Sequence, residues 1–292
     1  MRISEKKTLL SVEKLSIGFS QYVKGTRQRI IYPIADMHMD INEGEIVAVV
    51  GASGSGKSLL AHAVLGILPG NAVCGGRMTY RGEELTDKRK ERLRGREISF
   101  IPQSVNYLDP LLRVGKQVQI GLDKKTARSV QEKLFARYDL KKSDGRLFPY
   151  ELSGGMLRRV LFATSVREGV KLVIADEPTP GIHPEALSEI LRQLKEFACD
   201  GAGVMFITHD LMSALDIADR VAVLKDGTTV EIADSAAFAG QGERLRTEYA
   251  RRLWRALPQN DFDLEFKGME RGYDVADRRE SGLLLREKPL DI

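Results

Sequence analysis

The residues Gly51–Ser58 read GASGSGKS and fit the pattern Gly-x-x-x-x-Gly-Lys-Ser/Thr. Glycines in this pattern let backbone N–H groups curl around phosphate oxygens, and the helix that follows points the positive end of its dipole at the same charge. Lys57 is expected to reach the β- and γ-phosphates, and Ser58 is expected to ligate Mg²⁺. The residues expected around the phosphates are Gly51, Ala52, Ser53, Gly54, Ser55, Gly56, Lys57 and Ser58.

The sequence on either side of this loop supports the prediction. Glu45–Val50 is a mostly apolar, β-branched run, which indicates a strand buried on both faces. Ser58–Leu68 has the apolar spacing of a helix and stops at Pro69-Gly70. A buried strand, a glycine loop and a helix therefore follow one another, and an ordinary glycine turn is the less favoured alternative.

The rest of the chain alternates short apolar strands with helices. Lys171–Ala175 and Val204–Ile207 are expected strands, and Pro184–Ala198 is an expected helix between them. A strand–helix–strand order favours parallel pairing in an α/β sheet. The other expected elements are strands at Leu9–Phe19, Ile34–Ile41, Met78–Arg81 and Ile98–Ile101, and a hairpin at Arg220–Ile232 that turns at Asp226-Gly227.

Composition excludes several classes of protein. The chain has 292 residues and a net charge of +4 that is spread along its length, which is no footprint of a dedicated nucleic-acid binder. Apolar runs such as Ile46–Val50 are far shorter than the roughly 20 residues of a membrane helix, and Met1–Lys7 lacks the apolar stretch of a signal peptide. Two cysteines cannot form a disulfide framework, which favours a reducing compartment. We therefore expect a cytoplasmic protein that reaches a membrane through a partner.

A second candidate element is Lys171–Glu177, an apolar strand that ends in two carboxylates. In P-loop enzymes an acid at such a strand end supports Mg²⁺, and we assign this role to Asp176. The adjacent Glu177 would point elsewhere and could polarise the attacking water as a general base. Many apolar strands end in acids at a polar rim, so this segment is weak evidence without the loop.

The segment Leu152–Met156 contains Ser153, Gly154 and Gly155 before an expected helix. These residues offer another ring of backbone donors and a helix N-terminus, which is a second phosphate grip in one chain, whereas a simple capping turn is the alternative. Asp176-Glu177 follow by just over twenty residues, and His209 comes after the next strand. Together these motifs resemble the ATP-binding cassette (ABC) ATPases, and the match runs from Leu9 to about Asp234.

The resemblance implies the fold: α/β, an ABC ATPase (P-loop NTPase) core with a mixed sheet, an N-terminal antiparallel β-subdomain and a helical insert. The ABC ATPase domain would span residues 9–234, with residues 104–167 as the helical subdomain within it. Residues 235–258 would form the C-terminal helical element of one branch of the family. Residues 259–292 hold nine acids and six bases and few apolar residues, which predicts a charged, flexible tail.

The resemblance also gives roles to single residues. Gln103 matches the Q-loop glutamine, which senses Mg²⁺ and the attacking water and links the core to the insert. His209 matches the switch histidine, which contacts the γ-phosphate and helps to position Glu177. Phe19 lies where the family places an aromatic ring on the adenine, with Tyr22 as a competing candidate.

In the family two cassettes sandwich two ATP molecules. By that resemblance Ser153, Gly154 and Gly155, which form the family's signature, should bind the nucleotide held by the partner's phosphate loop. A half site alone would be a poor catalyst, because transition-state charge needs donors that are already in place.

The segments Phe148–Met156 and Tyr249–Pro258 resemble the oligopeptide, dipeptide and nickel importer branch. The chain departs from that branch in two places. The branch's dimer-contacting aspartate is replaced by His183, and its Arg-Gln-Arg after the signature is replaced by Leu157-Arg158-Arg159. A histidine at that position could make the contact between cassettes sensitive to pH.

The resemblance implies the ATP-hydrolysing subunit of an importer of peptides, nickel or metal-chelate small molecules, with ATP and Mg²⁺ as cofactors. It would be peripheral, at the cytoplasmic face of the cell membrane. Its partners would be two transmembrane permease subunits, a second ATPase subunit (a heterodimer is favoured over a homodimer) and, indirectly, an extracytoplasmic solute-binding protein, with no nucleic acid. The alternatives are a soluble ABC ATPase of DNA repair or translation, and a regulatory cassette with little hydrolysis.

Overall fold

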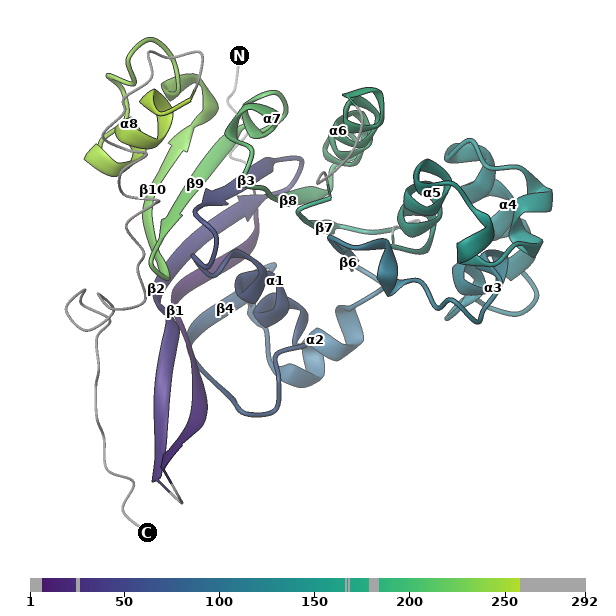
Figure 1. The fold of residues 1–292 in the computed structure, drawn as a ribbon, viewed down its shortest axis with the longest axis horizontal. Coiled ribbons are helices and arrows are strands. Elements are labelled where there is room, and N and C mark those ends of the chain that lie inside the picture. The colour runs from purple at the N-terminus through teal and green to yellow at the C-terminus, as the bar shows by residue number, and fades with distance from the viewer. Residues whose placement is uncertain (1–6, 25–26, 166, 168, 179–183, 258–292) are drawn as a thin grey trace.

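The computed structural model describes residues 7–24, 27–165, 167, 169–178 and 184–257 (Figure 1). The strands of these residues form one ten-stranded sheet in the order β5-β4-β1-β2-β10-β9-β3-β8-β7-β6. In chain order the strands are β1 Thr8–Lys24, β2 Arg27–Asn42, β3 Ile46–Gly51, β4 Ala72–Tyr80, β5 Glu83–Glu84, β6 Ile98–Ile101, β7 Leu172–Asp176, β8 Gly203–Ile207, β9 Arg220–Lys225 and β10 Thr228–Asp234. The α-helices are α1 Lys57–Leu65, α2 Asp87–Leu93, α3 Val114–Gln119, α4 Ala127–Arg137, α5 Gly154–Ser165, α6 Pro184–Cys199, α7 Leu211–Leu215 and α8 Glu248–Arg255.

The sheet has a parallel part and an antiparallel part. From β9 through β3, β8 and β7 to β6, each strand is parallel to the next. In contrast, β10 pairs antiparallel with β9, and β1 pairs antiparallel with both β2 and β4. The parallel bridge between Thr228 of β10 and Asp36 of β2 joins the two parts. The sheet is therefore mixed and the N-terminal strands are antiparallel, as the sequence predicts.

The register brings the carboxyl ends of the parallel strands to one edge. Ile207 of β8 pairs with Val49 of β3 on one side and with Asp176 of β7 on the other. Residues that directly follow these three strands therefore lie next to one another, which is where ligands bind in parallel α/β sheets.

Strand β3 separates two hydrophobic cores. Ile46, Ala48 and Val50 face a core that includes residues of α5, α6 and α8, whereas Val47 and Val49 face a core that includes α1 and the antiparallel strands. The alternation follows from the period of two along a strand. Because both faces of β3 are covered, the strand is apolar throughout, and it holds the loop that follows it rigidly.

A helical insert stands apart from the sheet. Figure 1 shows α3, α4 and α5 as a separate lobe beyond β6 and β7. Val114, Val118, Leu134, Phe135 and Val160 are among the buried residues that give this lobe its apolar centre. The chain enters the lobe after β6 and returns to the sheet at β7.

The last described helix, α8, packs on β10 and is held by a carboxylate. Glu231 accepts hydrogen bonds from the backbone N–H groups of Arg246 and Thr247, at 2.7 and 2.8 Å, and from Thr247 Oγ1. Trp254 donates its indole N–H to the carbonyl of Gly240. The proposed tail, residues 259–292, and His183 lie outside the described residues.

Several element boundaries differ from the sequence expectation. Strand β1 runs to Lys24 rather than Phe19, and β2 begins at Arg27 rather than Ile34, because these two segments pair with each other. Helix α1 ends at Leu65 rather than Leu68, because Gly66 adopts a left-handed φ of 67° and its N–H bonds back to Ala63. Strand β4 begins at Ala72, well before the expected Met78, because Ala72–Cys74 pair with β1. The pairing partner, which the local sequence does not reveal, sets the length of that strand.

Candidate nucleotide site

The loop Gly51–Ser58 joins β3 to α1, as predicted, and two of its glycines are required by the fold. A Cβ on Gly51 would lie 2.3 Å from the carbonyl oxygen of Leu224, so the neighbouring strand β9 leaves no room for a side chain. Gly56 has a φ of 96°, which L-residues rarely adopt. The loop can therefore keep its curled backbone only with glycine at these positions.

Lys57 turns its side chain back into this loop. Its Nζ donates hydrogen bonds to the carbonyl oxygens of Gly51, at 2.8 Å, and Ala52, at 3.1 Å. Burial lowers the pKa of the Lys57 ammonium, although the carboxylates of Glu177 and Asp176 act in the opposite direction. The positive charge is thus held at the centre of the loop, beside two acids.

Ser58 and Asp176 meet across the edge of the sheet. Ser58 Oγ donates to Asp176 Oδ1 at 3.1 Å, and Asp176 is buried at the end of β7. Burial raises the pKa of the Asp176 carboxyl, and the hydrogen bond from Ser58 partly opposes that rise. A hydroxyl and a carboxylate side by side are hard oxygen donors of the kind that suits Mg²⁺.

Two observations test whether this donor set fits Mg²⁺ and phosphate. Within the described ranges no group of three or more His, Cys, Asp or Glu residues could hold a metal ion. Mg²⁺ ordinarily takes one or two carboxylates and completes its shell with substrate phosphates and water, so the Ser58–Asp176 pair fits that pattern. The second observation concerns the phosphate: among the described residues, the buried Oγ of Ser55 in the loop has no hydrogen-bond partner.

Glu177 lies beside Asp176 but faces different partners. Its backbone has a φ of 41°, and its N–H donates to the carbonyl of Ile207 at 2.8 Å. Its Oε2 accepts a hydrogen bond from Gln103 Nε2 at 2.9 Å and lies 3.7 Å from His209 Nδ1. The structure therefore brings together three residues that sequence reasoning placed in one site.

Residues on either side of His209 fix its position after β8. The buried Thr208 donates its backbone N–H to Val49 of β3, at 3.2 Å, and its hydroxyl accepts from the N–H of Asp210, at 3.0 Å. Asp210 in turn caps α7 by accepting from the N–H of Met212. The imidazole itself remains largely exposed beside Glu177.

Comparison with known proteins identifies the family. The sequence pattern of the ABC transporter family matches residues 34–180. The chain belongs to the ABC transporter family. It is an ATP-binding ATPase cassette of that family, and the identification made from its motifs is confirmed.

Named relatives and solved structures agree with this family assignment. The oligopeptide transport ATP-binding protein OppD of Escherichia coli K12 is 33% identical over 236 residues, which cover 76% of this chain and 68% of that protein. The metal-staphylopine import system ATP-binding protein CntD of Staphylococcus aureus is 32% identical over 258 residues, 83% of this chain and 92% of that protein. Among solved structures, the ATP-binding cassette MJ0796 in a dimeric, post-hydrolysis state with ADP and Pi matches 78% of this chain and 99% of its own, at 25% identity and a TM-score of 0.66.

The cassette's signature residues lie away from its phosphate loop. Ser153 Oγ accepts a hydrogen bond from the N–H of Met156 at 3.3 Å and so begins α5. Nothing lies within 4 Å of a Cβ built on Gly154 or Gly155, and all three residues are exposed. Figure 1 shows α5 in the helical lobe and α1 under the sheet. Within one cassette, then, the signature does not join the cluster around Lys57.

Phe19 is placed on β1, opposite Ile31 of β2 and Ala72 of β4. Its ring is half-buried and packs against the core that contains α1. No hydrogen bond or ring contact joins it to the phosphate loop among the described residues. The side chain of Tyr22, the competing candidate, lies outside the described part of the chain.

One contact of the cassette was not anticipated from the sequence. Arg158 of α5 donates a hydrogen bond from Nη1 to the carbonyl oxygen of Pro178, the residue after Glu177. The sequence did carry a signal for this contact, because Arg158 stands where the importer branch has glutamine. The sequence analysis assigned no role to Arg158.

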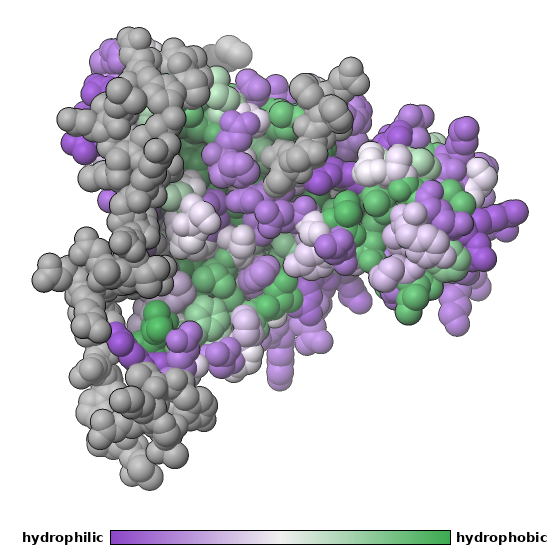
Figure 2. Space-filling view, viewed as in Figure 1, coloured by the Kyte–Doolittle hydropathy of each residue, from purple (hydrophilic) through white to green (hydrophobic). Residues whose placement is uncertain are grey.

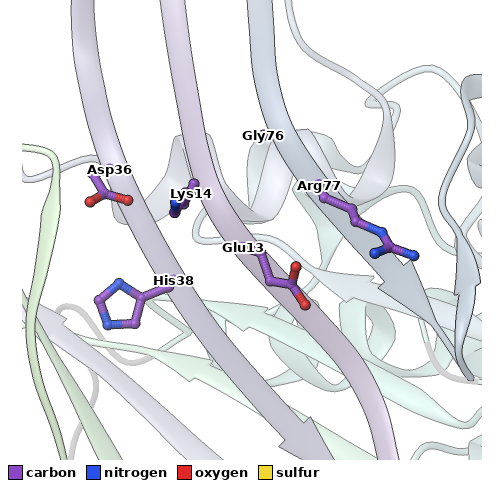
Figure 3. Close-up of a pocket in the computed structure, with 6 residues that line it drawn as sticks. All are labelled: Glu13, Lys14, Asp36, His38, Gly76 and Arg77. Atoms are coloured by element: carbon purple, nitrogen blue, oxygen red, sulfur yellow. The ribbon is translucent and has the colours of Figure 1, made fainter.

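A separate hollow lies on the antiparallel strands, on the face opposite the phosphate loop. Figure 3 shows the side chains around it, and the lining residues are Glu13, Lys14, Asp36, His38, Gly76 and Arg77. Asp36 and His38 flank the buried Met37, whose side chain lies on the Gly56 side of β2. Because neighbouring strand residues face opposite ways, the hollow and the phosphate loop lie on opposite faces of β2.

Proposed function

We propose that this cassette is the ATP-hydrolysing subunit of an importer of peptides, nickel or metal-chelate small molecules, at the cytoplasmic face of the membrane. The observation that carries the proposal is the cluster at the ends of β3, β7 and β8. There Lys57, the Ser58–Asp176 pair and the Glu177–Gln103 pair lie together. The names of the relatives, which transport oligopeptides and a metal chelate, support the class of cargo.

Binding of ATP follows from the loop. Backbone N–H groups of Gly51–Ser58 and the N-terminus of α1 would surround the phosphates, and Lys57 would move its hydrogen bonds from loop carbonyls to phosphate oxygens. Phe19 would stack on the adenine.

Mg²⁺ would be held by Ser58 and Asp176, with Gln103 nearby. The ion would neutralise charge on the β- and γ-phosphates during phosphoryl transfer. The carboxyl of Asp176 must be ionised for this role. A bound Mg²⁺ would place positive charge beside the buried carboxylate and so favour its ionised form.

Hydrolysis would use Glu177 as the general base. Its carboxylate accepts a proton from water as the water oxygen bonds to the γ-phosphorus, and the bond from that phosphorus to the ADP oxygen breaks. Gln103 and His209 would orient the Glu177 carboxylate and the water, since both side chains already face Oε2. The two adjacent carboxylates have different hydrogen-bond partners, Ser58 for Asp176 and Gln103 for Glu177.

The exposed signature supports action in trans. Ser153 is exposed and open space surrounds Gly154 and Gly155, which suits donors meant for a nucleotide on a second cassette. We favour a different ATPase subunit as that partner. An ATP-dependent dimer with full hydrolysis from this purified chain alone would instead establish a homodimer.

The helical lobe offers the surface for the permease subunits. Figure 2 shows apolar surface on this lobe. Four large hydrophobic side chains of residues 104–167 are strongly exposed: Tyr107, Leu111, Ile120 and Tyr150. Large exposed apolar side chains that gather on one part of a protein are typical of interaction sites. Tyr107 follows Gln103 closely, so a permease bound here would lie near the residue that contacts Glu177.

The proposal is tested by purifying the tagged chain from detergent-solubilised native membranes with ATP present. We expect two permease subunits, and a second ATPase, to co-purify. Leu111→Asp should reduce the permease recovered at least about tenfold, since an acid would be buried in an apolar contact. Val73→Asp, at an exposed valine on β4, is the matched control and should leave recovery unchanged. A chain recovered with ribosomes, with nucleic acid or alone would contradict the importer.

A further inference from the structure

Arg158 connects the signature helix to the turn that carries the proposed general base. It lies one helical turn after Gly154 on α5, and its Nη1 donates to the carbonyl oxygen of Pro178. Pro178 is buried and directly follows Glu177. The signature and the general base of the same chain are therefore joined by one side chain.

The contact completes the restraint of an unusual backbone turn. Glu177 has a φ of 41°, in the left-handed region that a residue with a side chain occupies only when its surroundings enforce it. Its N–H is fixed by Ile207 of β8. The carbonyl of Pro178 is fixed by Arg158, so the turn is held before and after Glu177. The direction in which the Glu177 carboxylate points depends on both restraints.

The neighbouring arginine shows that this is a specific use of Arg158. Arg159, the next residue, points instead to the carbonyl and carboxylate of Asp139 within the helical lobe. Arg158 makes no ion pair with any described carboxylate, and burial lowers the pKa of its guanidinium. A half-buried cation whose described partner is a backbone carbonyl is a costly way to hold a turn. The cost of partly burying this guanidinium is explained if the position of the Glu177–Pro178 turn matters for turnover.

We propose that Arg158 is a positioning residue that orients Glu177 from the signature helix of its own chain. When the partner's nucleotide engages the signature, movement of α5 would pass through Arg158 to the Glu177–Pro178 turn. Occupancy of the partner's site would thereby set the orientation of the general base in this one. The inference rests on the proposed function, because it takes Glu177 as the general base.

The test compares Arg158→Met with Arg159→Met in the assembled transporter complex. Arg158→Met removes the donor but keeps an apolar chain of similar length. We expect kcat for ATP to fall about tenfold with KM unchanged, since one hydrogen bond to a backbone group is lost while the phosphate loop is untouched. Arg159→Met should hydrolyse ATP at the wild-type rate. Arg158→Lys, which keeps a charged donor, should recover turnover to within about threefold of wild type.

A second measurement separates orientation of the base from closure of the two cassettes. In a Glu177→Gln background, ATP is bound but not consumed, so the nucleotide retained per complex reports closure. Adding Arg158→Met should leave that quantity unchanged. Wild-type turnover in Arg158→Met, an equal loss in Arg159→Met, or a loss of retained nucleotide would each overturn the inference. If Arg158→Met does not assemble, Arg158→Lys replaces it: turnover about two- to threefold below wild type at the wild-type KM supports the inference, and wild-type turnover or an altered KM opposes it.

Failure of the proposed function would look different. In that case Glu177→Gln would hydrolyse ATP as fast as the wild type, whatever residue stood at position 158.

Discussion

Gln103 and Glu177 are hydrogen-bonded, with 2.9 Å between Nε2 and Oε2, although 74 positions separate them in the sequence. Gln103 follows β6, at the point where the chain leaves the sheet for the helical lobe, and Glu177 follows β7, the next strand in the sheet. A shift of the lobe would therefore move the amide away from the carboxylate. Under the proposed function, this contact lets a permease bound to the lobe influence the water that Glu177 orients.

Lys57→Ala should abolish tight nucleotide binding. The ammonium is already held within the loop, so its loss removes a charge-assisted contact to phosphate and leaves the carbonyls of Gly51 and Ala52 without their donor. We expect affinity for ATP to fall about 100-fold, equivalent to about 2.7 kcal/mol. A titration with fluorescent ATP measures this, and Lys88→Ala, on the exposed side of α2, should bind as the wild type does. Equal affinities would show that this loop does not hold the phosphates.

Asp176→Asn should stabilise the nucleotide-free protein while it removes Mg²⁺-dependent hydrolysis. Burial raises the pKa of Asp176, so the folded state binds this proton more tightly than the unfolded state. The stability that the group contributes is present below its unfolded pKa and is lost as the pH rises through the folded pKa. At pH 7 the ionised carboxylate therefore destabilises the fold. Asparagine removes the cost of burying this charge and keeps an oxygen that can accept the hydrogen bond from Ser58.

Thermal unfolding measures the change in stability that Asp176→Asn causes. We expect the unfolding midpoint of Asp176→Asn at pH 7 to rise by about 2 °C, a shift typical of under 1 kcal/mol in a domain of this size. The difference from wild type should shrink as the pH falls toward 4. A variant that unfolds at a lower temperature than the wild type at pH 7, without nucleotide, would contradict the account.

Glu231→Ala should release α8. Burial opposes ionisation of Glu231, but hydrogen bonds from Arg246 and Thr247 outweigh it and leave the pKa lowered. A lowered pKa means that this stability is present above the unfolded pKa and is lost as the pH falls through the folded pKa. Removing the acceptor should cost about 2–3 kcal/mol, since the hydrogen bonds are to a charged group.

The chain's single tryptophan reports this release. Trp254 is buried on α8, so its fluorescence should shift to longer wavelength when the helix leaves β10. We expect the shift in Glu231→Ala at neutral pH, and in the wild type on acidification. Glu248→Ala, which removes a surface acid from the same helix, serves as the control and should keep the wild-type spectrum. An unshifted Glu231→Ala would mean that α8 is held by its apolar contacts alone.

The phosphate loop and its flanking elements could be predicted because each depends on local sequence. The glycines of Gly51–Ser58, the apolar run before them and the helix after them are all read within twenty residues. The turn at Asp226-Gly227 is also local, and both residues adopt positive φ as such a turn requires.

Contacts between distant segments could be predicted only through the resemblance to a family, or not at all. The Ser58–Asp176 hydrogen bond spans 118 positions, and no local pattern encodes the register of β7 and β8 that creates it. Asp176 was assigned because it ends an apolar strand in a chain with a phosphate loop, whereas the family pattern supplied Gln103. It supplied nothing for Arg158, because this chain departs from the pattern there and the new contact depends on the path of the chain after β7. The assignments of roles to these residues stay predictions.

The most direct test is steady-state ATP hydrolysis by the complex purified from membranes, with wild-type chain and with Glu177→Gln. The account predicts Mg²⁺-dependent turnover in the wild type and a fall of at least about 100-fold in the variant, because the general base is lost. ATP binding should stay within about twofold, since Glu177 contacts no part of the phosphate loop by hydrogen bond within the described residues. Turnover that survives Glu177→Gln, or falls only because ATP no longer binds, would contradict the assignment of this site.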